Sequence, residues 1–119
     1  MSDKPHPDFV YRLVSSAEWR IAQHSGVIPL RDIDERDGYI HLSTREQVLE
    51  TAKLHFSGAD DLIAIQIPLS LLGDDIKFEL APKRGDQFPH FYGALKKHHV
   101  SAVLPLIRTG DEFAFGAPQ

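Results

Sequence analysis

The chain has 119 residues, of which 42% are hydrophobic and 25% are charged, and this length supports one globular domain with a single core. It contains no cysteine, which excludes thiol catalysis, thiolate metal sites and disulfide bonds. The formal net charge is −4, so we expect no bulk binding of nucleic acid through its phosphates. Because no apolar run in the sequence is long enough to cross a membrane, we expect a cytoplasmic protein without a membrane partner.

The expected organisation is a flexible N-terminus over residues 1–8, one α+β domain over residues 9–115 and a flexible C-terminus over residues 116–119. The domain begins with a predicted strand from Phe9 to Val14, in which Arg12 stands on an apolar face between two valines. An unpaired guanidinium in such a place is costly. Arg12 therefore either lies at the strand margin, where it pairs with an acid or extends to water, or holds an anionic ligand.

A capping box, Ser15-Ser16-Ala17-Glu18, predicts that a helix begins after this strand. The helix contains Trp19, which we expect in the core, and it ends at Gly26, a residue suited to the left-handed conformation. The next segment, Val27 to Asp37, contains a proline and mixes charges of both signs. We expect a surface loop or a helical turn there.

The segment from Gly38 to Gln47 is the strongest candidate for a functional site. Side chains alternate between the two sides of a strand, so one face is expected to be apolar and the other to carry a phenol, an imidazole and a hydroxyl. Overlapping capping boxes at Ser43 and Thr44 then predict a helix from about Arg45 to Phe56. The N-terminus of such a helix favours an anion. The polar side chains of the row are Tyr39, His41 and Ser43.

Four further strands are predicted later in the chain. The first is apolar almost throughout, which is typical of a central strand covered on both faces. Three helical segments among about six strands, with hairpin-type turns late in the chain, indicate an α+β fold with mostly antiparallel strands. The four strands are Leu62 to Ile67, Ile76 to Leu80, Val100 to Ile107 and Phe113 to Phe115.

The residues from Phe88 to Gly93 form a second candidate. They include Pro89, His90 and Tyr92, and we expect them in a loop that continues from residues 81–87. A loop that is this apolar but has polar tips suits contact with a ligand. The alternative is an aromatic plug over the end of the sheet, with His90 and Tyr92 hydrogen-bonded to the backbone.

Two common kinds of site are not expected. The histidines at positions 41, 90, 98 and 99 have no helical i, i+4 spacing and no accompanying ligand pattern of acids, so we predict no metal site. Ser43 follows a strand but lacks a G-x-S-x-G elbow, and His41 on the same strand face would point parallel to it. This arrangement disfavours a Ser-His-acid hydrolase.

The chain resembles the bacterial family catalogued as domain of unknown function 952. The resemblance rests on the sequences G-Y-I-H-L-S-T-R-E-Q-V at residues 38–48 and F-P-H-F-Y-G at residues 88–93, together with the opening strand, the first helix and Trp19. It covers the chain from Phe9 to Phe115. The family is similar in fold to the ADP-ribosyltransferase group, which implies a split or strongly bent sheet, two main helices and NAD as a possible cofactor in a cleft.

The similarity to ADP-ribosyltransferases also implies roles for individual residues. Arg12 occupies a place comparable to that of the residue that contacts the NAD ribose or phosphate in that group. The positions that correspond to its nicotinamide contacts are Tyr39, His41, Ser43 and Thr44.

The sequence departs from that group at the glutamate that usually stabilises the oxocarbenium-like centre. His90 and Tyr92 lie in the corresponding region, and Glu79 and Glu112 are the nearest acids in the sequence. Members of the group that transfer an RNA 2′-phosphate use Arg or His instead. Transfer of ADP-ribose is therefore not implied by the residues themselves.

The leading hypothesis is a cleft that binds a phosphate-bearing or nucleotide-like small molecule, such as NAD, ADP-ribose or a phosphorylated RNA end. If the protein is an enzyme, we expect transferase chemistry of the ADP-ribosyltransferase or phosphotransferase kind. Arg12 would hold an anion, and His41 and His90 would donate or accept protons. The remaining ligand contacts would be Tyr39, Ser43, Thr44 and Tyr92.

The alternative hypothesis is a non-catalytic binding or interaction module that uses the same polar and aromatic face. Exposed side chains of Phe91 and Tyr92 would be its anchors. Geometry discriminates between the two hypotheses: convergence of Arg12, His41 and His90 in one concave pocket favours a ligand site, and dispersal over a flat surface favours the module.

Overall fold

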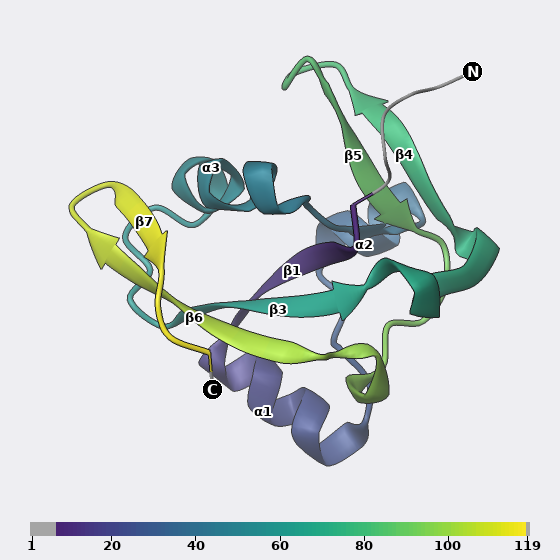
Figure 1. Cartoon of the computed structure of the whole chain (residues 1–119), viewed down its shortest axis with the longest axis horizontal. Helices are drawn as coiled ribbons and strands as arrows, with labels where there is room; N and C mark the ends of the chain where they lie inside the picture. The colour runs from purple at the N-terminus through teal and green to yellow at the C-terminus, as the bar shows by residue number, and fades with distance from the viewer. Residues whose placement is uncertain (1–6, 119) are drawn as a thin grey trace.

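The computed structural model describes residues 7–118 as two sheets with helices packed around them (Figure 1). In chain order the elements are β1 (Phe9–Ser15), α1 (Ser16–Ser25), α2 (Asp32–Asp37), β2 (Ile40–His41), α3 (Arg45–His55), β3 (Leu62–Pro68), η1 (Leu69–Asp75), β4 (Ile76–Ala81), β5 (Asp86–Phe91), η2 (Lys97–His99), β6 (Ala102–Thr109) and β7 (Glu112–Phe115). The larger sheet has the order β1-β3-β6-β7 and the smaller has the order β2-β5-β4. All strand pairs in both sheets are antiparallel. The predicted α+β class is confirmed.

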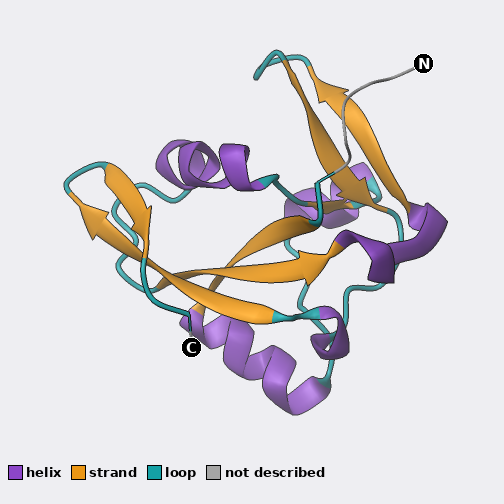
Figure 2. Ribbon diagram, in the orientation of Figure 1, coloured by secondary structure: helices purple, strands orange, loops and turns teal. Residues whose placement is uncertain are grey.

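The four-stranded sheet carries a hydrophobic cluster on each face. Helix α1 lies on one side of this sheet and helix α3 on the other (Figure 2). Val10 of β1 belongs to the cluster that includes Ala22 of α1, whereas Leu13 belongs to the cluster that includes Ala52 of α3. The neighbouring strand β3 contributes to both clusters in the same alternating way. Its nearly continuous apolar sequence is therefore explained by burial on both faces, as predicted.

Helix α1 begins where the capping box predicts. The Ser15 hydroxyl accepts a hydrogen bond from the Glu18 N–H at 3.1 Å, and the Glu18 carboxylate accepts one from the Ser15 N–H at 2.8 Å. Gly26 follows the helix with φ at 81°, in the left-handed conformation that ends many helices. Trp19 is half-buried against the hydrophobic cluster on the α1 side of the sheet.

The loop predicted from Phe88 to Gly93 is mostly a strand, so that prediction is wrong. β5 lies between β2 and β4, and residues 88–91 are all buried. A strand buried on both faces lacks the alternation of apolar and polar residues that marks a half-exposed strand. The sequence therefore did not indicate a strand here. Pro89 lies opposite Phe78 in this sheet, and its carbonyl accepts a hydrogen bond from the Leu42 N–H at 3.1 Å.

The candidate segment after Gly38 joins the two sheets. Only Ile40 and His41 pair with β5, so the strand is shorter than predicted. Two residues further on, Ser43 forms a bridge with Tyr11 of β1: the Tyr11 N–H donates to the Ser43 carbonyl at 2.8 Å, and the Ser43 N–H donates to the Tyr11 carbonyl at 2.9 Å. One short stretch of chain therefore fixes the smaller sheet against the edge of the larger one.

The segment from Val27 to Asp37 contains helix α2 at its end, which agrees with the predicted helical turn. The predicted flexible ends at residues 1–8 and 116–119 include residues 1–6 and 119, which lie outside the described residues. Within the described part, the Asp8 carbonyl accepts a hydrogen bond from the Leu69 N–H at 2.9 Å, and the Gly116 N–H donates one to the Pro105 carbonyl at 2.7 Å.

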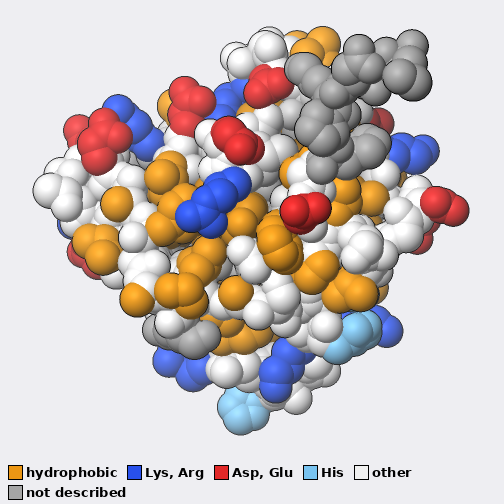
Figure 3. All heavy atoms as spheres, in the orientation of Figure 1, with side chains coloured by type: hydrophobic (Ala, Val, Ile, Leu, Met, Phe, Trp, Pro, Cys, Tyr) orange, Lys and Arg blue, Asp and Glu red, His pale blue; other side chains and the backbone are white. Residues whose placement is uncertain are grey.

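The face of the molecule seen in Figure 1 carries hydrophobic side chains across its middle, where β3 and β6 lie (Figure 3). Ile107 of β6 is 57% exposed and Ile21 of α1 is 53% exposed. Helix α1 therefore covers the sheet incompletely and leaves the end of β6 open. No helix within residues 7–118 has the length and apolar character that a membrane crossing requires.

Replacing Gly38 by alanine is expected to lower the free energy of unfolding by about 1–2 kcal/mol, because a side chain in the left-handed conformation is strained. Gly38 has φ at 82°, and a Cβ placed there would have no atom within 4 Å. The cost therefore arises from the backbone and not from a clash. The free energy of unfolding measured in urea should be highest with glycine at this position, lower with asparagine and lowest with alanine, since asparagine tolerates this conformation better than alanine does. Equal stabilities would contradict this account.

Candidate functional site

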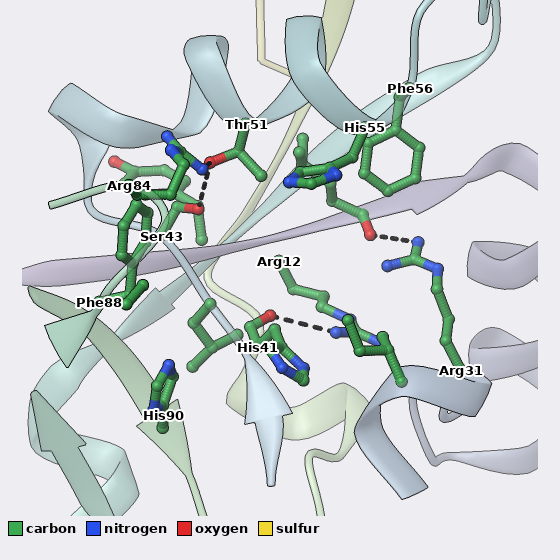
Figure 4. Close-up of a pocket in the computed structure, with 15 residues that line it drawn as sticks. Arg12, Arg31, His41, Ser43, Thr51, His55, Phe56, Arg84, Phe88 and His90 are labelled. Carbon is green, nitrogen blue, oxygen red and sulfur yellow. Dashed lines mark hydrogen bonds between the residues drawn. The ribbon is translucent and has the colours of Figure 1, made fainter. Parts of the chain in front are cut away.

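A cavity of about 370 Å³ lies where the two sheets meet helix α3 (Figure 4). Its walls come from β1, from the segment that joins the sheets, from the end of α3, from the residues around the start of α2 and from the β4–β5 hairpin. The described residues that line it are Tyr11, Arg12, Leu13, Arg31, Ile33, His41, Leu42, Ser43, Thr51, His55, Phe56, Ala81, Arg84, Phe88 and His90.

Arg12 lies at the base of the cavity and is paired within the protein. Its side chain is 2% exposed, and both of its terminal nitrogens bond to the Asp34 carboxylate, at 3.0 and 2.5 Å. Nη1 also donates to the His41 carbonyl at 3.1 Å. The buried Nε has no hydrogen-bond partner among the described residues. Arg12 therefore has the acid partner that one of the two sequence interpretations requires.

The buried carboxylate of Asp34 connects three parts of the fold. Besides the two bonds from Arg12 of β1, it accepts one from the Arg31 N–H at 2.7 Å, next to the start of α2. It also accepts one from the His41 N–H of β2 at 3.2 Å, and it lies 2.8 Å from His41 Nδ1. Burial raises the pKa of Asp34, but the hydrogen bonds from His41, Arg12 and Arg31 outweigh burial and hold the pKa well below its usual range.

Both ring nitrogens of His41 face carboxylates. Nδ1 lies 2.8 Å from Asp34, and Nε2 lies 2.9 Å from Asp37 at the end of α2. A carboxylate only accepts hydrogen bonds, so the ring satisfies both partners when it carries a proton on each nitrogen. Hydrogen bonds from Arg36 and His41 lower the pKa of Asp37. The geometry thus leaves no free nitrogen on His41 for proton transfer.

His90 lies beside His41 on the neighbouring strand β5 but has a different environment. Its Nδ1 lies 2.9 Å from Glu79 Oε1, and the same oxygen accepts a hydrogen bond from the Tyr92 hydroxyl at 2.5 Å. The ring of Tyr39 stacks on His90 with centroids 4.0 Å apart and an angle of 21°. The bond to Glu79 raises the pKa of Tyr92 to about 12, and the bonds from Tyr92 and His90 lower the pKa of Glu79.

Two pairs of an arginine with a phenylalanine stand on opposite sides of the cavity in Figure 4. The guanidinium of Arg31 lies 4.9 Å from the centre of the Phe56 ring, and that of Arg84 lies 4.5 Å from the centre of the Phe88 ring. Nη2 of Arg31 donates to the Leu13 carbonyl at 2.5 Å and to the Glu18 carboxylate at 2.8 Å, and its other terminal nitrogen points toward the middle of the cavity. Burial and the nearby charge of Arg12 lower the pKa of Arg31.

Polar contacts hold the β4–β5 hairpin to helix α3. Arg84 donates to the Thr51 hydroxyl at 3.1 Å and to the Glu50 carboxylate at 3.4 Å. The side-chain amide of Gln47 donates to Asp86 at 3.0 Å and to the Gln87 carbonyl at 2.7 Å. The hairpin wall of the cavity is therefore fastened mainly by hydrogen bonds.

The structure brings part of the predicted site together. Arg12, His41, Ser43 and His90 all line the cavity, and the rings of His41 and His90 have centroids 5.8 Å apart. Tyr39 and Tyr92 flank His90 outside this lining, with ring centroids 5.3 Å apart.

Three predicted contacts have other surroundings. The Ser43 hydroxyl lies 3.2 Å from the Thr51 hydroxyl. The Thr44 N–H at the start of α3 is bonded to the Gln47 side chain at 3.0 Å, and Thr44 is outside the cavity lining. Phe91, expected as an exposed anchor, is 5% exposed and belongs to the core, so that prediction is wrong. Its side chain faces inward because its strand is covered on both faces.

Sequence reasoning missed Asp34, Arg31 and Arg84. The first two lie in a segment whose charges alternate in sign, so the sequence offers no mark that separates a buried acid from exposed ones. Arg84 belongs to a hairpin turn that reads as a polar loop. The lone charge at Arg12 was the usable signal, because it required an acid partner somewhere in the chain.

Residues 13–103 match a family model described as a protein of unknown function (DUF952). The chain belongs to this family. The crystal structure of protein CC0527 from Caulobacter crescentus is similar to it, with 34% identity, 93% of each chain covered and a TM-score of 0.80. The solution NMR structure of CC0527 is also similar, with 34% identity, 89% of this chain and 90% of that chain covered, and a TM-score of 0.78. No curated protein matches the chain.

In this DUF952 chain, replacing Asp34 by asparagine is expected to lower the free energy of unfolding at pH 7 by about 3–5 kcal/mol, because the buried guanidinium of Arg12 loses its counter-charge. Urea unfolding measures the change. Asp74→Asn at an exposed position alters the net charge equally and is the control. A loss no larger than that of the control would contradict the structural importance of the buried pair.

The contribution of Asp34 to stability is expected to depend on pH. Its folded pKa lies below the unfolded value of 3.8, so the contribution is fully present above pH 3.8 and is lost as the pH falls below it. The difference in unfolding free energy between the wild type and Asp34→Asn should therefore shrink by about 1.4 kcal/mol per pH unit below that point. A difference that stays constant between pH 5 and pH 2.5 would contradict the low folded pKa.

Proposed function

We propose that the cavity of this protein binds a phosphate-bearing or nucleotide-like ligand. The observation that carries the proposal is the composition of the lining: three arginines and three histidines face the cavity, with no Asp or Glu among the described lining residues, and the carboxylates that pair with the three arginines lie outside the lining. This lining stands out in a chain whose formal net charge is −4. A cleft lined by one sign of charge attracts ligands of the opposite sign, and guanidinium groups match the oxygens of phosphate well.

The size and walls of the cavity support a ligand that combines an anion with a flat apolar group. Its volume of about 370 Å³ lies toward the lower end of the range of roughly 300–1,000 Å³ that is common for small-molecule sites. The Phe56 and Phe88 rings each lie next to a guanidinium, so a base or similar ring has aromatic surface beside a phosphate-binding group. These dimensions favour one nucleotide unit within the cavity over a whole dinucleotide.

The proposal includes an ADP-ribosyltransferase-like arrangement, which two small antiparallel sheets around one cavity support. NAD fits this cavity poorly as a donor of ADP-ribose, because no carboxylate among the described residues lines it. The nearest acids in the sequence have other partners: Glu79 binds His90 and Tyr92, and Glu112 pairs with Lys53 at 2.6 Å. A phosphorylated nucleotide or RNA end therefore fits better, and a cytoplasmic location belongs to the same proposal.

The alternative function is a non-catalytic interaction module. Exposed apolar side chains at the smaller sheet favour it, since Leu80 is 60% exposed and Tyr92 is 43% exposed. Burial of Phe91 removes one of its expected anchors. The convergence of Arg12, His41 and His90 on one cavity favours the ligand site instead.

Calorimetry with NAD, ADP-ribose and a 2′-phosphorylated dinucleotide tests the proposed function. Binding heat is expected from the 2′-phosphorylated dinucleotide, because its terminal phosphate presents the most negative charge to the arginines. Its affinity should fall as salt is added, since screening weakens the attraction between charges. No heat from any of the three at high protein concentration would overturn the proposal.

Replacing Arg84 by alanine is expected to raise the dissociation constant of the bound ligand about tenfold or more, because a charge-assisted hydrogen bond contributes roughly 1.5–3 kcal/mol. Lys83→Ala is the matched control, since it removes the same charge from the adjacent, exposed position. Equal weakening by both variants would show that overall charge and not the cavity determines the affinity.

A further inference from the structure

We propose that His90 is the proton-transferring group of the cavity, that Glu79 positions it, and that the substrate is a phosphate ester. This inference rests on the proposed function and adds a reaction to it. Binding of an anion requires only the arginines, whereas a reaction requires a group that can take up a proton next to the bound phosphate. His90 has the surroundings of such a group.

Three contacts fix the position of the His90 ring. Nδ1 is bonded to Glu79 Oε1 at 2.9 Å, and the Tyr92 hydroxyl donates to the same oxygen at 2.5 Å, which orients the carboxylate. Tyr39 stacks on one face of the ring. The backbone of His90 is held in the central strand of the smaller sheet, opposite Lys77. A ring held in this way keeps one orientation without help from a ligand.

The bond to Glu79 also determines which ring nitrogen can react. A carboxylate accepts a hydrogen bond, so the neutral ring carries its proton on Nδ1 and has a lone pair on Nε2. Within residues 7–118, Nε2 of His90 makes no hydrogen bond. Because Nδ1 is bonded to Glu79, Nε2 is on the ring edge turned away from that carboxylate. His90 is part of the cavity lining, whereas Glu79 is outside it. A carboxylate behind a histidine is the usual means of preparing such a base.

The other two histidines of the lining lack this combination. His41 has both nitrogens engaged, by Asp34 and Asp37. His55 is exposed at the end of α3, and no carboxylate among the described residues holds its ring. Figure 4 places His90 and Phe88 on the same side of the cavity, with Arg31 and Phe56 across from them. The geometry therefore singles out His90 as the base that faces a bound phosphate.

The reaction that these groups support is hydrolysis of a phosphate ester. Nε2 of His90 accepts a proton from a water molecule as the water oxygen forms a bond to phosphorus. The bond between phosphorus and the ester oxygen breaks on the side opposite the attacking water. The leaving oxygen takes a proton from a solvent water molecule, and Nε2 releases its proton to the solvent. The ring ends the cycle as it began, and no oxidant or reductant is consumed. Arg31 and Arg84 would offset the negative charge that develops on the phosphoryl oxygens.

The tautomer of His90 can be tested without any substrate. Long-range ¹H–¹⁵N correlation spectra of the full chain should show the neutral His90 ring with its proton on Nδ1. Addition of 2′-AMP, which carries a terminal phosphate, should move the Nε2 resonance more than the Nδ1 resonance. A proton found on Nε2 of the neutral ring would overturn the inference, whatever the stability of any variant.

Turnover of p-nitrophenyl phosphate and of 2′,3′-cyclic AMP tests the reaction with a monoester and a cyclic diester. Release of product is expected from at least one, and His90→Gln should lower kcat about 10²–10⁴-fold with little change in KM. Glu79→Gln should lower kcat less and displace the acidic limb of the pH–rate profile, a change that a merely structural role would not produce. His24→Gln on the exposed side of α1 is the control and should leave the rate unchanged.

The same measurements separate the two proposals. If 2′-AMP binds with a dependence on Arg84 but neither ester is turned over, the proposed binding function stands and the reaction is refuted. Turnover that His90→Gln leaves intact would refute the role of His90 in the same way. If 2′-AMP, NAD and ADP-ribose all fail to bind and neither ester reacts, both proposals fall.

Discussion

The buried carboxylate of Asp34 is the constraint on which the arrangement of this protein depends. Taking a carboxylate and a guanidinium out of water is costly unless nearly every donor and acceptor is paired. Asp34 meets this demand by joining Arg12 of the larger sheet, His41 of the smaller sheet and the backbone of Arg31. Any shift of one sheet relative to the other breaks several charged hydrogen bonds at once. Hydrophobic clusters supply bulk stability on both faces of the larger sheet, but the charged network fixes the angle at which the sheets meet.

This network also divides the cationic groups of the cavity into two kinds. Arg12 lines it, yet its charge is already balanced by the buried Asp34, and both ring nitrogens of His41 are engaged by Asp34 and Asp37. Arg31 and Arg84 are more exposed than Arg12, and their partners Glu18 and Glu50 lie outside the cavity lining. Each of the two guanidinium groups is placed beside an aromatic ring. A ligand therefore meets a rigid, internally neutralised floor, and side walls whose guanidinium groups face the cavity while their partner carboxylates lie outside its lining. Rigid support beneath adaptable contacts is how binding sites reach a defined geometry.

Much of the fold could be predicted from the sequence because local rules determine it. The capping box at Ser15, the end of α1 at Gly26 and the doubly buried β3 all follow from patterns within a few residues. β5 was missed because burial on both faces removes alternation, and the presence of Pro89 conceals a strand whose pairing is supplied by distant residues. The site was harder to predict because its contacts also join residues that are distant in the sequence. A sequence shows that Arg12 needs a partner, but which acid supplies it depends on how the chain returns 22 residues later.

The attachment of the β4–β5 hairpin to α3 has a consequence for the local stability of the cavity wall. Gln47 and Arg84 hold the tip of this wall through a few side-chain hydrogen bonds, and a segment with few packed apolar contacts opens at lower free energy than a core. The tip of the hairpin, residues 82–87, can therefore open locally while β4, β5 and β2 stay paired. Amide hydrogen exchange would be faster along the tip of the hairpin than in β1 or β3. Opening at the hairpin tip is in this sense a local motion, resisted by two polar side chains and separated from the global stability of the domain.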